Sequence, residues 1–182
     1  MLKILNNTIL NTYNYMGAGI LPVAMHKNQL FFLFGKENKC TDTPGWSDFG
    51  GGKEEQERPM TTAIREGYEE LSGFLGSKSQ LNTQVKNNLI CSVESNRYTT
   101  FIFKADYCEM LPVYFNRNFR FMQKNAPHIL SKKGLYEKSE IKWMTTHEIT
   151  QNRRQFRNYY DKEFLDSILA EERNIRKALR IS

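Results

Sequence analysis

The sequence has few cysteines and no long apolar run. Its 182 residues include three cysteines, Cys40, Cys91 and Cys108, without C-x-x-C spacing. This odd number indicates neither a disulfide framework nor a zinc site and favours a reducing setting. The first sixteen residues are interrupted by asparagines, so they do not resemble a signal peptide, and no later segment has the length of a membrane span. We therefore expect a cytoplasmic chain without a membrane partner.

Several catalytic signatures are also missing. The histidines His26, His128 and His147 are scattered without metal-ligand spacing, which is typical of surface or packing residues. The glycine run at 50–52 is not followed by Lys-Ser or Lys-Thr at Walker spacing, which excludes a P-loop. Ser47 lies in no nucleophile elbow.

The overall composition is that of a folded domain. Hydrophobic residues make up 40% of the chain and aromatic residues 13%, which argues against disorder and is enough for one sizeable core. The net charge of +6 makes nucleotides, nucleic acid or polyphosphates plausible partners, but a basic chain is equally consistent with simple solubility.

Hydrophobic patterning predicts a mixed α/β domain, in which strands precede and follow a central helix. Pro59 suits the first position of that helix, and Gly73 lies just past its end. Pro22, inside the first strand, fits a sheet edge best. The expected segments are a hairpin at 17–34, a polar loop at 35–45, a strand at 46–52, a helix at 59–71, strands at 88–96, 97–107 and 140–144, and a helix at 164–179.

The stretch AIREGYEEL at 63–71 concentrates negative charge. If it is helical, Glu66, Glu69 and Glu70 stand at i, i+3 and i+4 and share one face, where like charges repel. Hard cations such as Mg²⁺ or Mn²⁺ bind carboxylate oxygens, so a bound cation would remove this repulsion. The stretch predicts either a metal site or a solvated acidic face.

The surrounding spacing resembles that of a known family. Five residues separate Gly51 from Glu57, and seven more precede Arg65-Glu66, which is followed by Glu69 and Glu70. This series over 51–73 is similar to the G-x5-E-x7-R-E-x-x-E-E motif of the Nudix hydrolases. The resemblance implies an α/β/α sandwich with a mixed sheet and a C-terminal helical extension. It predicts one domain over 1–182, with a core at about 17–150 and a helical segment at about 151–182.

The resemblance also implies roles for the motif residues. Glu69 and Glu70 would be the principal ligands of Mg²⁺ or Mn²⁺, Glu66 a ligand or general base, and the Gly51 carbonyl a further ligand. Glu57 would orient the loop with Arg65, and Gly50 belongs to the structural part of the motif. From spacing alone, Arg65 lies four residues before Glu69 and can form an ion pair with it.

Three positions depart from the family pattern. Gly67 replaces a bulky apolar residue and weakens a helix by about 1 kcal/mol relative to alanine. Ser72 stands where the family has glycine, with Gly73 one place later, and Gln56 replaces the glycine common before Glu57. The departures at Gly67 and Ser72 affect helix packing and the exit turn rather than the expected ligands.

A second acidic site is expected before the strand that carries Trp143. In LYEKSEIKWM, Glu137 lies six residues before Trp143 and Glu140 three before it. By resemblance to the family, Glu137 is the first candidate for an extra metal ligand or general base and Glu140 the second. A solvated charge at the strand entry is the alternative.

Two basic segments bear on the substrate. Residues 110–136 contain no acidic residue, and a helix there would place Phe115, Phe119 and Met122 on one side, opposite its basic residues. The segment 152–160 adds arginines beside aromatic residues that could stack on bases. Both are either substrate-binding surfaces or solvated faces; the candidates are Arg117, Arg120, Lys124, Arg153 and Arg154.

The resemblance favours a metal-dependent hydrolase that cleaves a phosphoanhydride bond. Capped RNA or another highly anionic substrate ranks first, because WSDFGGG at 46–52 is similar to Nudix proteins of large DNA viruses, some of which remove mRNA caps. Nucleoside or dinucleoside polyphosphates and diphosphoinositol polyphosphates rank second. A Nudix-fold module that binds RNA or nucleotide without turnover is the alternative of another class, and a structural adaptor that uses the C-terminal helix is a third.

Overall fold

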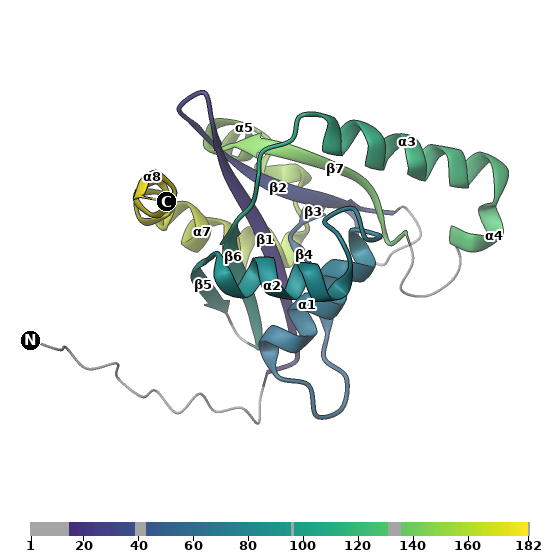
Figure 1. The fold of residues 1–182 in the computed structure, drawn as a ribbon, viewed down its shortest axis with the longest axis horizontal. Helices are drawn as coiled ribbons and strands as arrows, with labels where there is room; N and C mark the ends of the chain where they lie inside the picture. Colours follow the sequence, from purple (N-terminus) through teal and green to yellow (C-terminus); the bar gives the residue numbers. More distant parts are fainter. Residues whose placement is uncertain (1–14, 39–42, 96, 131–135, 182) are drawn as a thin grey trace, which may run out of the picture.

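The computed structural model describes residues 15–38, 43–95, 97–130 and 136–181, which form one mixed sheet covered by helices (Figure 1). No helix in these ranges combines the length and apolarity needed to cross a membrane. The strands are β1 Gly17–His26, β2 Gln29–Glu37, β3 Trp46–Ser47, β4 Phe49–Gly52, β5 Leu89–Ser95, β6 Tyr98–Lys104 and β7 Lys138–Thr145. The main helices are α1 Pro59–Glu70, α2 Lys78–Asn87, α3 Met110–Asn125, α5 Thr146–Gln151, α7 Asp166–Ala170 and α8 Glu172–Ile181, with single turns α4 Pro127–Leu130 and α6 Asn158–Tyr160.

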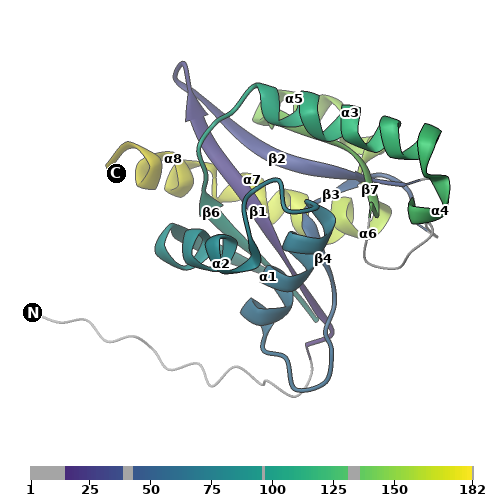
Figure 2. The ribbon, with the colours of Figure 1, turned by 45° about the vertical axis from the view of Figure 1, so that its right-hand side comes forward.

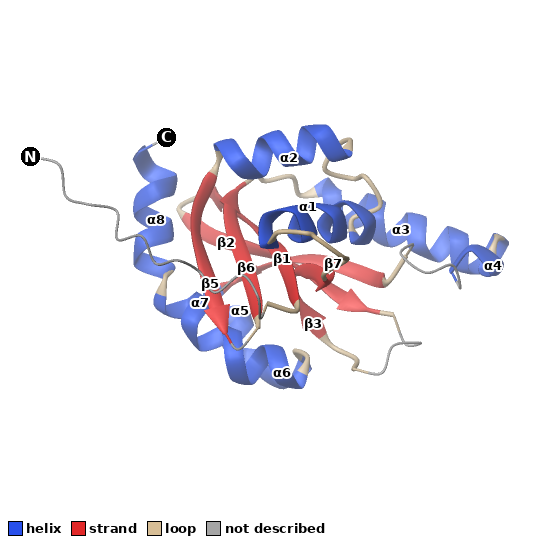
Figure 3. Ribbon diagram, turned by 90° about the horizontal axis from the view of Figure 1, so that it is seen from below, coloured by secondary structure: helices blue, strands red, loops and turns tan. Residues whose placement is uncertain are grey.

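Three layers make up the molecule, as expected from the sequence. In Figure 3 the sheet lies between α1 and α2 on one side and α6 and α7 on the other. The first face packs Ile20, Phe49 and Phe103 against the α1, α2 and α3 side chains. The second face packs Phe32 and Phe34 against the C-terminal helices. The predicted α/β/α sandwich with a mixed sheet is confirmed.

The hairpin of β1 and β2 follows from its turn residues. Lys27 and Asn28 both have positive φ, 47° and 64°, as the two central residues of a type I′ turn require. His26 and Gln29 close the ladder beside them. The second strand continues to Glu37, so the expectation of a loop from residue 35 was wrong at its start.

Strand β1 lies in the centre of the sheet and changes partner along its length. Residues 17–20 pair with β4 and residues 23–26 pair with β2, while β6 runs parallel on the other side. Pro22 lies between the two antiparallel segments, where its missing N–H interrupts neither ladder, so its expected place at a sheet edge was wrong. The sheet divides at this point: β4 pairs with β1, whereas β3 and β7 pair with β2.

Helix α1 begins at Pro59, as predicted, and packs against β1 and β4 (Figure 2). Gly67 faces β1 so closely that an added Cβ would lie 2.4 Å from Ile20 Cδ1. The glycine that departs from the family pattern therefore lets the helix approach the sheet. After α1, Ser72 and Gly73 have φ of 51° and 73°, so Ser72 adopts the left-handed conformation that favours glycine.

The C-terminal segment differs from the single helix expected at 164–179. A π-helical turn, Asp161–Leu165, is followed by α7 and then by α8, with a break at Glu171. The expected apolar stripe is nonetheless buried and joins the second core face; its members are Phe164, Leu165, Ile168, Ile175 and Leu179.

Candidate functional site

The glycine turn and α1 meet at one end of the sheet. Gly51 lies in β4 opposite Ala18, and a Cβ at Gly51 would lie 2.6 Å from the Glu66 carboxyl carbon. Only glycine leaves room for that carboxylate. Gln56, in the loop that leads to α1, has φ of 63°, which explains why glycine is common at this position.

Arg65 organises the acidic residues of the motif. Its Nε and Nη2 donate to the two oxygens of Glu57 at 2.9 Å, and Nη2 also donates to the Gly52 carbonyl at 2.9 Å. Its Nη1 lies 2.7 Å from Glu66 Oε1 and 3.4 Å from Glu69 Oε2. The ion pair expected between Arg65 and Glu69 is present, and the guanidinium ties loop and helix together.

These contacts shift the pKa values in opposite directions. The hydrogen bonds from Arg65 are the main reason why the pKa of Glu57 falls to about 2. Burial raises the pKa of Glu66; Arg65 opposes this shift, and the charges of Glu69 and Glu137 add to it. The negative charges of Glu69 and Glu137 therefore disfavour the ionised form of Glu66, and a bound cation would offset their effect.

Glu70 faces a different environment from Glu66 and Glu69. Its Oε2 accepts from the Gly50 amide at 2.7 Å, and its Oε1 lies 3.2 Å from Lys138 Nζ. The side chain is only 3% exposed, whereas that of Glu69 is 34% exposed. Burial raises the pKa of Glu70 well above its usual range, against the opposing charge of Lys138. The three glutamates thus do not share a single environment.

Lys138 and Glu70 belong to a buried cluster at the division of the sheet. Lys138 also contacts Glu37 and Ser47, and Arg157 Nη1 donates to Glu37 Oε1 at 2.9 Å. Asp48 lies beside them and accepts from Tyr98 and Thr100, at 3.1 and 2.7 Å. Burial raises the pKa of Asp48 to about 6. Sequence patterning missed this cluster, because its members come from strands, a helix and loops that are far apart in the sequence.

Glu137 and Glu140 flank the first residues of β7. Of the two, Glu137 acts on Glu66 through its charge, and Glu140 pairs in the ladder opposite Lys36. The role of Glu137 as a ligand or base stays a prediction.

The predicted basic residues fall into two groups. Arg117, Arg120 and Lys124 are exposed on α3, whose other side buries Phe115 and Phe119, as expected for an amphipathic helix. In the second segment, Arg154 is exposed, but Arg153 forms ion pairs with Asp161 and with Asp166. The charge of Arg153 is already compensated, so it has less to offer a substrate than the α3 residues.

A cleft of about 360 Å³ opens beside the glycine turn. Its wall carries Arg97, which the sequence had not singled out, and Arg157, which belongs to the predicted basic segment 152–160 and lies over the Tyr159 ring at 5.0 Å. Aromatic rings next to arginines suit a base and its phosphates. The cleft is lined by Met16, Gly17, Gly51, Gly52, Ser95, Arg97, Tyr98, Arg157, Tyr159, Glu163 and Phe164.

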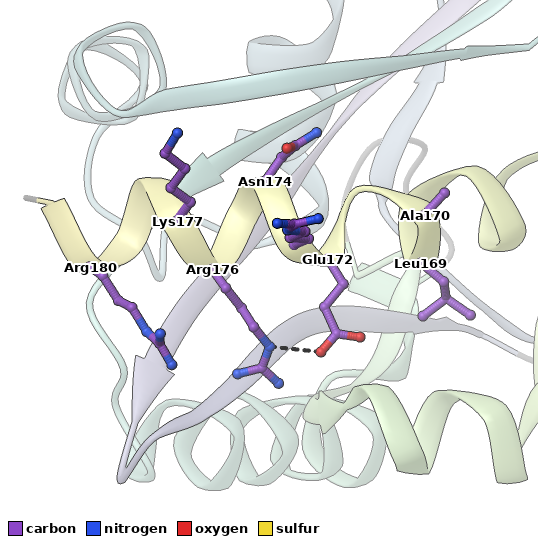
Figure 4. Close-up of a pocket in the computed structure, with 8 residues that line it drawn as sticks. Leu169, Ala170, Glu172, Asn174, Arg176, Lys177 and Arg180 are labelled. Carbon is purple, nitrogen blue, oxygen red and sulfur yellow. Dashed lines mark hydrogen bonds and ion pairs between the residues drawn. The ribbon is translucent and has the colours of Figure 1, made fainter.

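A second cleft, of about 930 Å³, lies along α7 and α8, apart from the motif (Figure 4). Its one carboxylate, Glu172, accepts from Arg176 Nε at 2.7 Å. Lys177 and Asn174 extend from one side of α8, and Arg176 and Arg180 from the other. This surface is basic, and its carboxylate is already paired with Arg176.

The acidic residues fit a divalent cation by their chemistry. Across the described ranges, no three acidic, histidine or cysteine side chains already converge on one point. Glu66 and Glu69 nevertheless present oxygens to the same Arg65 nitrogen, and hard cations take such ligands together with backbone carbonyls. Glu66 and Glu69 each give only one oxygen to Arg65, whereas both oxygens of Glu70 face other partners, Lys138 and Gly50.

Comparison with known proteins identifies the fold. No sequence family matches the chain, and no curated protein is similar to it. Two structures of a bifunctional NMN adenylyltransferase/ADP ribose pyrophosphatase from Francisella tularensis resemble it, one of them complexed with AMP and Mn ion. The TM-scores are 0.54 and 0.52 at 18% and 16% identity. Each match covers 87% of this chain but only 41% or 42% of the other.

A weaker similarity, with a TM-score of 0.47 and 14% identity, relates 88% of the chain to 88% of the NUDIX domain of Shewanella oneidensis NrtR complexed with ADP ribose. At these identities the resemblance concerns the fold alone. The chain spans about two-fifths of the length of the Francisella enzyme, so the activities in that enzyme's name are not transferred with the fold.

Proposed function

We propose that this chain is a divalent-metal-dependent Nudix hydrolase that cleaves a phosphoanhydride bond in a substrate containing a nucleoside diphosphate. The observation that carries the proposal is the position of Glu66 and Glu69, joined by Arg65 against the glycine turn. The fold, which is shared with part of an enzyme that includes an ADP ribose pyrophosphatase, agrees with it.

Glu66, Glu69 and the Gly51 carbonyl would hold Mg²⁺ or Mn²⁺, with Glu137 as a further ligand. Bound there, the cation would neutralise phosphate charge and lower the pKa of an attacking water molecule. Arg65 fixes the rotamers of both glutamates through Nη1. Glu66 Oε1 accepts from Arg65, which leaves Oε2, beside Gly51, for the cation.

The cleft beside the glycine turn is the proposed substrate site. Gly51 and Gly52 line it and also contact the motif, Gly51 through Glu66 and Gly52 through Arg65. A base that stacks near Tyr159, with phosphates near Arg97, would bring its anhydride toward the motif. The net charge of +6 would favour such an anion.

Among such substrates we place capped RNA first. The exposed Arg117, Arg120 and Lys124 on α3 offer charge for an RNA chain outside the cleft. A free nucleotide would need only the cleft itself. Nucleoside polyphosphates, dinucleoside polyphosphates and diphosphoinositol polyphosphates are therefore the substrates from which capped RNA must be distinguished.

The decisive experiment is product analysis by chromatography with Mg²⁺ and with Mn²⁺. Capped RNA, the free cap dinucleotide and the three polyphosphate classes would be tested with the wild-type chain, Glu66→Gln and Glu54→Gln. Glu54 is 71% exposed and lies 3.9 Å from Arg65, so Glu54→Gln is a matched control for the loss of one acidic charge. The expected result is release of 7-methylguanosine diphosphate, lost in Glu66→Gln and retained in Glu54→Gln.

The other outcomes separate the alternatives. Turnover of small nucleotides alone would keep the hydrolase and remove RNA as its substrate. Tight RNA binding without turnover of any compound would indicate the non-catalytic module. Equal activity of Glu66→Gln and the wild-type chain would exclude the mechanism.

A further inference from the structure

Lys138 is a lysine with a completely buried side chain at the start of β7. Its Nζ contacts Glu37 Oε1, lies 3.0 Å from Ser47 Oγ and lies 3.2 Å from Glu70 Oε1. An ammonium group has three donors, and these three acceptors use all of them. The stem of Lys138 fills the space left by Gly35, where an added Cβ would lie 2.9 Å from the lysine Cδ. The cation is therefore fixed by both its charge and its packing.

Both carboxylate oxygens of Glu70 also have partners. One of its oxygens faces Lys138, and the other accepts from the Gly50 amide at 2.7 Å. A divalent ion could bind Glu70 only by displacing one of these partners inside a site that is 3% exposed. It would also approach the Lys138 ammonium, and two cations repel strongly where water is excluded.

Several buried acidic side chains lie close to Lys138. Glu37, Asp48 and Glu70 are all buried, and Arg157 is the second cation that reaches the group, through Glu37. Lys138 Nζ lies between the carboxyl groups of Glu37 and Glu70 and forms an ion pair with each.

We infer that Lys138 is the resident cation of Glu70: it holds this carboxylate against Gly50, joins α1 to the glycine turn, and keeps Glu70 out of the coordination sphere of the catalytic metal. The inference rests on the proposed function, because it divides the motif glutamates into two metal ligands, Glu66 and Glu69, and one positioning residue. It departs from the expectation that Glu70 is a principal ligand.

The first test is equilibrium Mn²⁺ binding, measured from the electron paramagnetic resonance signal of free Mn²⁺. Glu66→Gln should weaken binding about tenfold or more, because it removes a ligand. Glu70→Gln should change the Kd by less than about threefold, since Lys138, not the metal, loses its partner. A loss in Glu70→Gln as large as in Glu66→Gln would overturn the inference.

The second test needs no metal. Lys138→Met leaves Glu37 and Glu70 without their shared cation and should lower the Tm by roughly 10 °C. In the Glu70→Gln background, Lys138→Met should lower the Tm by a clearly smaller amount. Equal Tm losses from Lys138→Met in the two backgrounds would overturn the inference. Added Mn²⁺ should raise the Tm of Lys138→Met more than that of the wild-type chain, because Glu70 becomes free to bind it.

The two proposals can fail separately. A wild-type chain that neither binds Mn²⁺ nor hydrolyses any compound of the panel would end the proposed function. The metal-free coupling between Lys138 and Glu70 would still decide the positioning role. If Lys138→Met does not fold, Lys138→Gln, which retains a donor and most of the stem, replaces it in the same comparison.

Discussion

Arg65 and Glu57 form a two-point ion pair, in which Nε donates to Oε1 and Nη2 to Oε2, each at 2.9 Å. The pair connects the loop after the glycine turn to the middle of α1. Thr62 Oγ1 and the Glu54 amide also donate to Glu57 Oε2, at 2.8 and 3.0 Å. A parallel pair of this kind fixes both position and orientation, so the geometry of the site depends on Glu57.

Glu57→Gln should lower the free energy of unfolding by about 2 kcal/mol at neutral pH, because charge-assisted hydrogen bonds are lost. The pKa of Glu57 is lowered from 4.5 to about 2, so its contribution is present above pH 4.5 and is lost as the pH falls toward 2. Thermal unfolding across this range should show the variant and the wild-type chain converging in acid. In contrast, the exposed Glu54→Gln should change stability by less than about 0.5 kcal/mol. A stability difference between Glu57→Gln and the wild-type chain that persists toward pH 2 would contradict the assignment.

Gly67→Ala should destabilise the chain, although alanine is the better helix former. The added methyl would lie 2.4 Å from Ile20 Cδ1, and overpacking of this kind costs about 1–3 kcal/mol. In an Ile20→Ala background the obstacle is gone, and the same change should stabilise by up to about 1 kcal/mol. Urea unfolding of the four proteins gives both numbers. The same sign in both backgrounds would mean that Gly67 does not set the distance between α1 and β1.

Asp48→Asn should change the pH dependence of stability. Burial raises the pKa of Asp48 from 3.8 to about 6, so the contribution of its protonated form is complete below pH 3.8 and is lost as the pH rises through 6. Asparagine cannot ionise, so the stability of Asp48→Asn relative to the wild-type chain should rise over this interval, by on the order of 2–3 kcal/mol.

Thermal unfolding at several pH values measures that gain. The exposed Asp106→Asn is the control and should follow the wild-type chain throughout. A constant difference between Asp48→Asn and the wild-type chain would show that Asp48 does not titrate in this interval.

The elements that the sequence predicts correctly are those with local signals. The β1–β2 hairpin depends on two turn residues, and α1 on Pro59 and its apolar spacing. Helix α2 was not predicted: its capping box, Ser77 and Gln80, is a local signal, but the helix buries only Leu81 and Val85, so its apolar spacing is weak. The break at Glu171 carries no proline or glycine, so apolar spacing alone could not reveal it.

The contacts of the candidate site also differ in whether local spacing could predict them. Arg65 and its partners Glu66 and Glu69 are neighbours on one helix, so spacing alone placed them together. Lys138 and Glu70 meet only because β7 joins the sheet beside β2, and this pairing depends on the whole topology. Local spacing thus gave the acidic face, and the tertiary fold decided which of its members faces a buried lysine.

A role for α3 in binding RNA can be separated from the effect of net charge. Arg117→Gln with Arg120→Gln should raise the Km for capped RNA roughly tenfold, leave that for the free cap dinucleotide unchanged, and reduce the salt slope of RNA binding by about 1.4. Arg173→Gln with Arg180→Gln makes the same charge change on α8, whose helix packs on the opposite core face. A local contact predicts that only the α3 pair affects RNA, because screening limits the field of exposed charges to about 10 Å. Equal losses from both pairs would reduce α3 to solvated surface, and a larger loss from the α8 pair would move the RNA to the cleft along α7 and α8.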